Sequence, residues 1–537
     1  MATALSQDVL SNSPRLLRRA LRAQEEGDLG KAERLFNAVL ERAPGDFDAL
    51  HGLAQIHCWR GRFDTALVVM QTVLRAHPDR ADGFGTLGLA FHGLRQFAYA
   101  LKSFEEGLRL APDDAELMNR RGVALLELRR GVEALDSFTR ALDREPAHLD
   151  ALANRANALM MINHPLAALE AYDRALALAP DNADLLTNRA VALRRLDRPQ
   201  EALLSMRRVL ARKPDHAQAR FLESLTQLTL GDFAAGWRGY ESRWGVGRLA
   251  AQRRNFTAPL WRGDAPLDGK SILLHAEQGF GDTLHFVRYA PLVARRGARA
   301  VYVEVQKELA RLLSGLPGVA AVIPRGDPLP AFDLHCPLLS LPHAFATDAS
   351  TIPVDVPYVA PRGEDVASWR DLLPAGKPLI GVVWSGDSAH DNDLNRSIGL
   401  AALAPLLARP QLSFVSLQHE MSDGDRTLAR DFPNLHVLPQ PFRDFADTAA
   451  VIAQLDAVIA VDTAVAHLAG ALAKPLLLLL PFAADFRWLR ERRDSPWYPT
   501  ARLYRQPAFG DWSGAIAQLT QDLGRADLFP WQQRLSA

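Results

Sequence analysis

The sequence has little cysteine and no excess charge of either sign, and each shortage excludes a class of protein. Only Cys58 and Cys336 occur in 537 residues. Two cysteines are too few for a disulfide framework or a four-cysteine zinc site, and both suit a reducing compartment. The 62 lysines and arginines balance 62 aspartates and glutamates. This balance indicates neither a nucleic-acid-binding surface nor an acidic disordered chain.

Long apolar runs are also missing. A membrane-spanning helix needs about 20 consecutive apolar residues, and the most apolar stretch, 456–482, is interrupted by Asp462, His467 and Lys474. The first residues lack an apolar block ahead of a small-residue cleavage site, so we infer no export signal. We therefore expect a cytoplasmic protein with no membrane span and no nucleic-acid partner.

The first half of the chain is repetitive. Prolines recur every 34 residues, each preceded by an alanine at a distance of twelve residues and by a large apolar or aromatic residue at eight. The prolines are Pro44, Pro78, Pro112, Pro146, Pro180 and Pro214; the alanines are Ala32, Ala66, Ala100, Ala134, Ala168 and Ala202; the large residues are Phe36, Met70, Phe104, Phe138, Tyr172 and Met206. Two helices per repeat explain the pattern, because a small residue lets paired helices cross closely and a large one fills the groove between them.

These positions resemble the tetratricopeptide repeat family over about residues 13–246. Gly88 and Gly122 stand at the small position of the first helix, and residues 221–245 look like a degenerate seventh repeat. The resemblance implies an α-solenoid that binds proteins. We place it at residues 13–247, after a tail at 1–12.

Asparagines within the repeats are candidates for gripping a peptide backbone. Asn154 and Asn188 occupy the same phase in neighbouring repeats, and Asn157 lies one helical turn from Asn154. An amide side chain can bind a backbone without reading its sequence. The alternative is that these residues only solvate an exposed helix face.

The second half alternates apolar runs with amphipathic stretches, which predicts parallel β-sheets flanked by helices. We expect a linker at 248–270, one α/β half at 271–374, a second at 375–525, and a tail at 526–537. The expected strands lie in 271–276, 298–305, 320–324, 377–386, 412–418, 435–439, 457–463 and 475–481. Two such halves predict a cleft between them, with ligands held at the carboxyl ends of the strands.

The loop after the first expected strand contains Gly279, Gly281 and Asp282, ahead of a helix expected from about Asp282. Leu284 occupies the third glycine position of a dinucleotide fingerprint, so the loop does not indicate an NAD enzyme. The glycines would let a substrate approach the backbone, and Asp282 would accept a proton. Alternatively, Asp282 is only the N-cap of the helix.

The strand at 457–461 leads into Asp462, Thr463 and Ala464, then a helix that contains His467. The first-turn amides of this helix and the Thr463 hydroxyl would suit a diphosphate. We expect Asp462 to orient the turn or a ribose, because a carboxylate repels phosphate. His467 is either a ligand contact or a simple polar residue of the helix.

A third loop, after the strand at 377–386, holds Ser385 and Gly386, followed by Arg396 and Ser397. The Arg396 guanidinium could neutralise a leaving phosphate. The embedded sequence Asp-Asn-Asp at 391–393 looks like an acidic metal-binding motif, but two carboxylates alone are a weak cation signal. We interpret it as a loop and expect no metal site.

Together, the three loops resemble the heptosyltransferase-like superfamily of GT-B glycosyltransferases over about residues 268–525. The resemblance implies two Rossmann-like domains and metal-independent, inverting transfer of a sugar from a nucleotide sugar. Asp282 matches the general base, and Arg396 stands where the superfamily has a phosphate-binding lysine. Asp462, Thr463 and His467 match donor-binding positions, and Gln418 falls loosely near the nucleoside position.

The joint order of repeats and transferase is similar to bacterial repeat-fused protein glycosyltransferases, including flagellin-modifying enzymes, and in plan to eukaryotic O-GlcNAc transferase. We therefore expect an α plus α/β protein whose repeats recruit an acceptor protein, with flagellin as a candidate, and whose co-substrate is a nucleotide sugar without further cofactor. Two alternatives stay open. The α/β part could be a non-catalytic nucleotide-binding domain on a scaffold, or the acceptor could be a lipid-linked sugar or polysaccharide.

Overall fold

The computed structural model describes residues 2–390 and 392–525. The chain forms two compact units, Met1–Ala192 and Leu193–Ala537. The predicted tail at 526–537 lies outside the described residues, whereas most of the segment predicted as a tail at 1–12 belongs to the first helix, α1.

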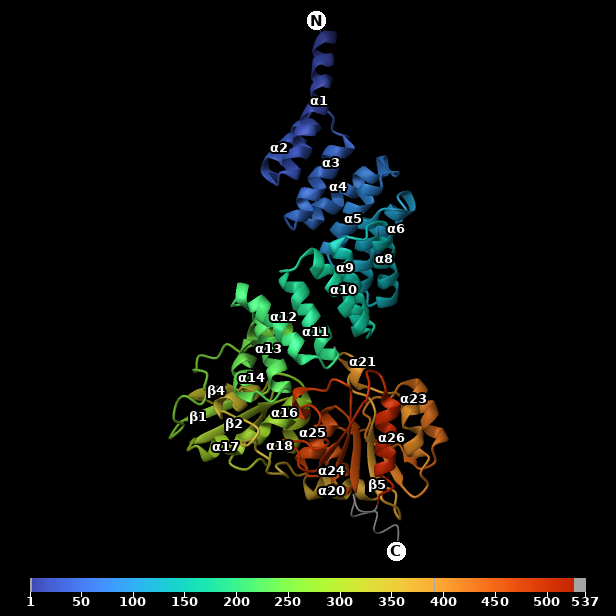
Figure 1. The fold of residues 1–537 in the computed structure, drawn as a ribbon. Helices are drawn as coiled ribbons and strands as arrows, with labels where there is room; N and C mark the ends of the chain where they lie inside the picture. Colours follow the sequence, from blue (N-terminus) through green and yellow to red (C-terminus); the bar gives the residue numbers. More distant parts are fainter. Residues whose placement is uncertain (1, 391, 526–537) are drawn as a thin grey trace. The chain divides into compact units, whose positions relative to one another are not determined.

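Paired helices build the repeat array (Figure 1). They are α1 (Ala2–Glu25), α2 (Leu29–Leu40), α3 (Phe47–Trp59), α4 (Phe63–Ala76), α5 (Ala81–Gly93), α6 (Phe97–Leu110), α7 (Ala115–Glu127), α8 (Gly131–Arg144), α9 (Leu149–Met161), α10 (Pro165–Leu178), α11 (Ala183–Arg195), α12 (Pro199–Arg212), α13 (Ala217–Thr229) and α14 (Phe233–Tyr240). The alanines that recur every 34 residues are fully buried in the second helix of each pair. In two repeats, a Cβ added to Gly88 or Gly122 would come within 2.3 Å of Phe104 or 2.4 Å of Phe138. The periodic small and large residues therefore pack against one another, as the sequence predicts.

The second unit contains two parallel sheets. The smaller has the strand order β3-β2-β1-β4 and the larger β10-β9-β8-β5-β6-β7. The strands are β1 (Ser271–His275), β2 (Ala300–Val305), β3 (Ala321–Pro324), β4 (Leu334–Pro337), β5 (Leu379–Val383), β6 (Ser413–Ser416), β7 (Leu435–His436), β8 (Ala457–Val461), β9 (Leu476–Leu480) and β10 (Ala501–Arg505). An α-solenoid followed by a region of parallel sheets and helices is thus confirmed.

Helices connect and flank these strands; α26, for example, covers part of the larger sheet (Figure 1). The α-helices are α15 (Gly247–Ala251), α16 (Phe280–Phe286), α17 (Ala290–Arg295), α18 (Lys307–Leu313), α19 (Leu341–Ala344), α20 (Gly363–Arg370), α21 (Asp393–Arg396), α22 (Ala404–Leu407), α23 (Asp423–Leu428), α24 (Phe445–Gln454), α25 (Ala464–Ala471) and α26 (Trp512–Asp522). The 3-10 helices are η1 (Glu241–Gly245), η2 (Val287–Tyr289), η3 (Leu338–Ser340), η4 (Leu400–Leu403), η5 (Ala429–Asp431) and η6 (Phe486–Trp488).

The two α/β halves are joined by a charged cluster around Arg311 of α18. Its guanidinium donates to both carboxylate oxygens of Asp444, at 2.8 and 2.6 Å, and to Asp447 at 2.7 Å. It also contacts Asp365 of α20. One arginine thereby links the helices of the first half to the N-terminus of α24 in the second, and such bidentate pairs fix geometry as well as charge.

The end of the repeat array shares a hydrophobic core with both sheets. Trp237 of α14 is 2% exposed and packs edge-on against Phe486 at a ring separation of 5.5 Å and Phe286 at 6.0 Å. Arg243 of η1 is fully buried and donates to both oxygens of Glu277 at 3.1 Å. The boundary between the two compact units lies within α11. The last repeat helices therefore belong to the same unit as the sheets, and the linker expected at 248–270 follows helices that already pack against them.

Candidate active site

Asp282 lies in the first turn of α16. The helix begins at Phe280, after the N-cap Gly279, so Asp282 is the third helical residue and not the N-cap residue that the sequence suggested. Its side chain instead reaches back, and Oδ2 accepts the backbone N–H of Gly279 at 3.0 Å. The chain turns into the helix earlier because an acidic side chain at the third helical position can satisfy the N-cap amide.

The second oxygen of Asp282 binds an arginine that sequence reasoning missed. Arg487 Nη2 donates to Asp282 Oδ1 at 2.5 Å, and Arg487 Nη1 donates to Asp485 at 2.8 Å. Arg487 lies in η6, after β9, with its guanidinium 4.5 Å from the Phe486 ring centroid. The only sequence signal was a group of arginines after the strand, which gives no indication of a partner 205 residues away.

The electrostatics of Asp282 reflect both burial and this ion pair. Burial raises the pKa of Asp282 above its ordinary value, the positive charge of Arg487 opposes the rise, and Asp485 adds to it. The Asp282 side chain is 23% exposed, and its raised pKa means that the carboxylate binds a proton more readily than a fully exposed one.

Helix α25 of the second half begins beside Asp282. Its N-cap is Thr463, whose Oγ1 is buried and has no hydrogen-bond partner among the described residues. A Cβ added to Gly281 would come within 2.8 Å of His467 Cδ2 and 3.5 Å of Ala464 Cα. The N-termini of α16 and α25 therefore converge, and their first-turn N–H groups lack intrahelical partners.

Arg396 reaches the same place from the loop after β5. Its Nη1 donates to the backbone oxygen of Asp462 at 3.0 Å, and its Nε contacts Asp393 at 3.4 Å. Burial and the negative charge of Asp485 raise the pKa of Asp462, and Arg396 opposes the rise. Asp391 of the sequence motif at 391–393 lies outside the described residues.

The remaining residues of this loop hold one another. Gly386 N–H donates to Ser397 Oγ at 2.9 Å, and a Cβ on Gly386 would meet Arg396 Nη2 at 2.6 Å. Gln418, just after β6, accepts the N–H of Ser385 at 3.2 Å and donates to its carbonyl at 3.1 Å. Gln418 therefore shapes the loop through its own amide, a contact that its loose match to a nucleoside position did not indicate.

His467 is buried within an aromatic group. The Tyr498 hydroxyl lies 3.0 Å from His467 Nδ1 and 2.9 Å from His285 Nδ1. The His467 ring stacks on Trp488 with a centroid distance of 5.4 Å. Burial lowers the pKa of His467 well below its ordinary value, as do nearby arginines, so the ring is neutral at pH 7. Its Nε2 stands 3.9 Å from Asp462 Oδ1.

The three candidate asparagines in the repeats pair with other polar side chains. Asn154 Nδ2 donates to Asn119 Oδ1 at 3.0 Å, and Asn188 Nδ2 donates to Asn157 Oδ1 at 3.3 Å. Tyr172 also donates to Asn157, at 2.6 Å. Each amide has further hydrogen-bonding capacity, so the internal pairing orients these side chains without exhausting them.

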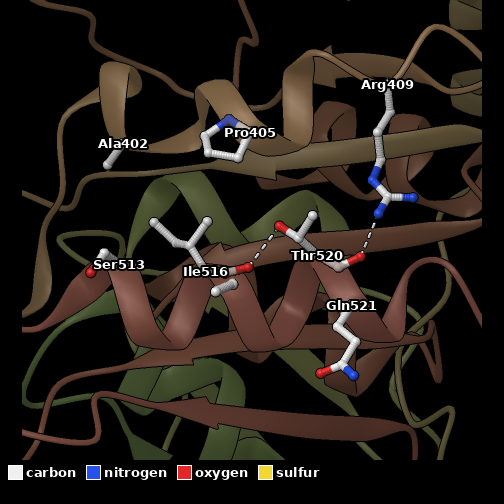
Figure 2. A pocket seen from close by; sticks show the side chains of 8 residues that line it. Ala402, Pro405, Arg409, Ser513, Ile516, Thr520 and Gln521 are labelled. Carbon is white, nitrogen blue, oxygen red and sulfur yellow. Dashed lines mark hydrogen bonds between the residues drawn. The ribbon is translucent and has the colours of Figure 1, made fainter.

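Other features of the described residues lie away from this convergence. A pocket between η4, α22 and α26 is lined by both apolar and polar side chains (Figure 2). Among them is Arg409, which donates to the Thr520 carbonyl at 2.5 Å. None of the predicted site residues lines it.

Among the described residues, no group of three or more His, Cys, Asp or Glu side chains could hold a metal ion. No helix there has the length and apolar character needed to cross a bilayer.

Both the repeat region and the α/β region of the chain match known protein families. Residues 23–86, 85–148, 133–183, 153–216 and 187–236 match tetratricopeptide repeat families. Residues 424–481 match glycosyltransferase family 9 (heptosyltransferase). This segment contains β8, Asp462 and the N-terminus of α25.

The individual proteins that resemble this chain have low sequence identity to it. Protein FlbA of Caulobacter vibrioides is 26% identical over 331 residues, which are 57% of this chain and 55% of FlbA, so the chain spans about half the length of this relative. Among solved structures, TTC0263, a thermophilic tetratricopeptide repeat protein of Thermus thermophilus, is 26% identical with a TM-score of 0.31, over 34% of this chain and 98% of its own. PilF of Pseudomonas aeruginosa is 15% identical with a TM-score of 0.37, over 40% and 99%. The chain thus contains tetratricopeptide repeats and, at residues 424–481, a segment that matches glycosyltransferase family 9.

Proposed function

We propose that the protein is a metal-independent, inverting GT-B glycosyltransferase that moves a sugar from a nucleotide sugar to a hydroxyl group of a protein acceptor recruited by the repeats. A serine or threonine of flagellin is one candidate for that hydroxyl. The observation that supports the proposal best is the convergence of a partly buried carboxylate, Asp282, with the N-terminus of α25.

In this reaction the acceptor oxygen bonds to the anomeric carbon as the bond from that carbon to the donor phosphate breaks. The acceptor proton passes to Asp282, and the electron pair of the broken bond leaves on the nucleotide phosphate. A carboxylate offers about four lone-pair positions, of which Gly279 and Arg487 use two, so Asp282 can still accept this proton.

The departing phosphate needs positive charge and hydrogen-bond donors. Arg396 and the first-turn amides of α25 supply both, because a helix N-terminus attracts anions. The buried Thr463 hydroxyl, which has no partner among the described residues, is available to donate to a phosphate oxygen. Donors held in place before the reaction stabilise developing charge more effectively than mobile water does.

The role of the repeats is recruitment of the acceptor. Asn154, Asn157 and Asn188 are the candidate contacts, because their pairing fixes amides that retain donors and acceptors. An acceptor segment held this way would be bound by its backbone, and its hydroxyl residue would then enter the α/β unit.

The test combines donor binding with transfer, using the full chain. Calorimetry with UDP-, CMP- and ADP-sugars identifies the donor class, and intact-mass analysis of a co-incubated candidate acceptor then shows the transferred sugar. In Asp282→Asn, donor binding should persist while transfer falls by about 10²- to 10⁴-fold, the usual contribution of a general base. The variant keeps an acceptor for the Gly279 amide, so helix capping is retained.

Each alternative predicts a different result. Donor binding without transfer to any acceptor would favour a non-catalytic scaffold, and transfer only to lipid-linked sugars or polysaccharide would reassign the acceptor. Full transfer by Asp282→Asn would refute the base. Transfer that persists in EDTA is expected, and transfer that requires an added divalent cation would refute metal independence.

A further inference from the structure

Arg487, the partner of Asp282, lies on a segment that contains 3-10 helix η6. Within it, Trp488 N–H donates to the Asp485 carbonyl at 3.1 Å, and Leu489 N–H donates to the Phe486 carbonyl at 3.2 Å. Arg505 of β10 donates a hydrogen bond from Nη2 to the Leu489 carbonyl at 2.9 Å. A short 3-10 turn has few internal hydrogen bonds, so its position depends on what packs around it.

Part of that packing comes from the repeat helices of the same compact unit. Asp197, in the turn between α11 and α12, accepts two hydrogen bonds from Arg490, from Nε at 2.8 Å and from Nη2 at 3.0 Å. Arg490 Nη2 also contacts the Asp197 carbonyl at 3.4 Å. This is a bidentate pair between side chains that are each about a quarter exposed. Two parallel hydrogen bonds fix the relative orientation of the two side chains better than a single exposed ion pair does.

A second contact reaches this segment through Phe486, the residue before Arg487. The rings of Trp237 and Tyr240 in α14 pack against Phe486 at 5.5 and 6.4 Å. Phe486 in turn lies beneath the Arg487 guanidinium. Burial lowers the pKa of Arg194 near the end of α11, and the charge of Asp485 opposes this, which agrees with a close approach of α11 to the same segment.

We propose that Asp197 is a positioning residue for the candidate active site: by binding Arg490, it keeps η6 in place and so holds Arg487 against Asp282. The repeat array would thus contribute to the chemistry as well as to recruitment. The consequence for Asp282 rests on the proposed function, whereas the mechanical part does not.

The charged and titratable groups around Asp282 determine the expected sign. Arg487, Asp485 and His390 act on it directly, and Tyr240 and Glu277 also lie within its electrostatic reach. Arg487 lowers the pKa of Asp282. A loosened η6 weakens that effect, so the carboxylate requires a higher pH to ionise, and the acidic limb of the activity profile moves upward.

The experiment uses Asp197→Asn and Arg490→Gln in the full chain. Asn suits position 197, where φ is +52°, better than most residues. Hydrogen exchange at the amides of 487–489 should accelerate in both variants, without change in the β-strands. The acidic limb of the kcat/KM profile should shift to higher pH, by part of the roughly 1–3 pH units by which an adjacent cation lowers a carboxyl pKa. The double variant should shift it little further than either single variant.

Asp494→Asn is the matched control, because it removes the Arg492–Asp494 ion pair from the same β9–β10 connection and should change neither measurement. Unchanged exchange in both Asp197→Asn and Arg490→Gln would overturn the proposal, as would faster exchange with an unmoved acidic limb. If the wild-type protein transfers no sugar, the proposed function fails, and the exchange measurement alone then decides whether Asp197 positions η6.

Discussion

Gly281 in α16 lies so close to His467 in α25 that a Cβ would come within 2.8 Å of the imidazole Cδ2. The two helices belong to different α/β halves, so this contact sets how closely the candidate base can approach the candidate phosphate site. His467 has little freedom to yield, because it is hydrogen-bonded to Tyr498 and stacked on Trp488.

Gly281→Ala should therefore push the two helices apart. The rate of sugar transfer should fall strongly, whereas the thermal unfolding temperature should change little. A displacement of about 1 Å between reacting groups can cost on the order of a hundredfold in rate. Gly363→Ala, in the first turn of α20, is the control, because nothing lies within 4 Å of the added Cβ. Steady-state transfer and thermal unfolding of both variants test the prediction, and normal transfer by Gly281→Ala would contradict it.

Arg396→Gln should weaken binding of the donor nucleotide. Losing a charged hydrogen bond to phosphate costs about 1.5–3 kcal/mol, or roughly ten- to hundredfold in Kd. Arg409→Gln is matched to it, since Arg409 also donates to a backbone carbonyl but lines the pocket beside α26 (Figure 2). Calorimetry with the preferred donor should show a loss for Arg396→Gln alone, and equal losses in both variants would argue against a phosphate contact.

Trp237→Ala should destabilise the α/β unit even though Trp237 belongs to a repeat helix. Truncating a fully buried tryptophan costs about 3–5 kcal/mol, and the cavity would open onto Phe286 and Phe486. Trp59→Ala in α3 is the control, because Trp59 is 55% exposed. Denaturant unfolding followed by circular dichroism measures both, and equal stabilities would show that the last repeat does not support the sheets.

The repeats and most strands could be predicted because each leaves a local signal. The 34-residue period places one small and one large residue per repeat, and parallel strands buried on both faces are apolar runs. The missed strands, β4 and β10, both lie at sheet edges. β10 carries Arg502 and Arg505, and β4 contains His335 and ends at Pro337, so neither has the composition of a central strand.

Long-range pairings in the site could not be predicted in the same way. The sequence shows that Asp282, Arg396 and Thr463 each follow a strand, and parallel topology favours their proximity. It does not show that Arg487 binds Asp282 or that Asp197 binds Arg490, because each pair joins segments more than 200 residues apart. The type of site follows from local pattern, whereas its electrostatic partners depend on tertiary packing.

Glu277, in the loop before α16, should make stability depend on pH. Two carboxylates, Glu277 and Glu241, share the buried guanidinium of Arg243. Burial raises the pKa of Glu277 from its ordinary 4.5 to about 7, against the pull of Arg243 and with a further contribution from Glu241. Between these two values the folded state binds more protons than the unfolded state, so this group's contribution to stability is complete below about pH 4.5 and is lost as the pH rises through 7.

Glu277→Gln removes this titration. Its stability deficit relative to the wild type should be largest near pH 5 and should shrink towards pH 8, by up to about 1.4 kcal/mol per pH unit within the window. Ser340→Ala removes the hydroxyl that accepts a hydrogen bond from Arg243 and donates one to Glu241. It leaves Glu277 in place, so its deficit should vary less with pH than that of Glu277→Gln. Denaturant unfolding of the three proteins between pH 5 and 8 measures the trend, and a Glu277→Gln deficit that stays constant or grows with pH would show that Glu277 is already ionised throughout the range.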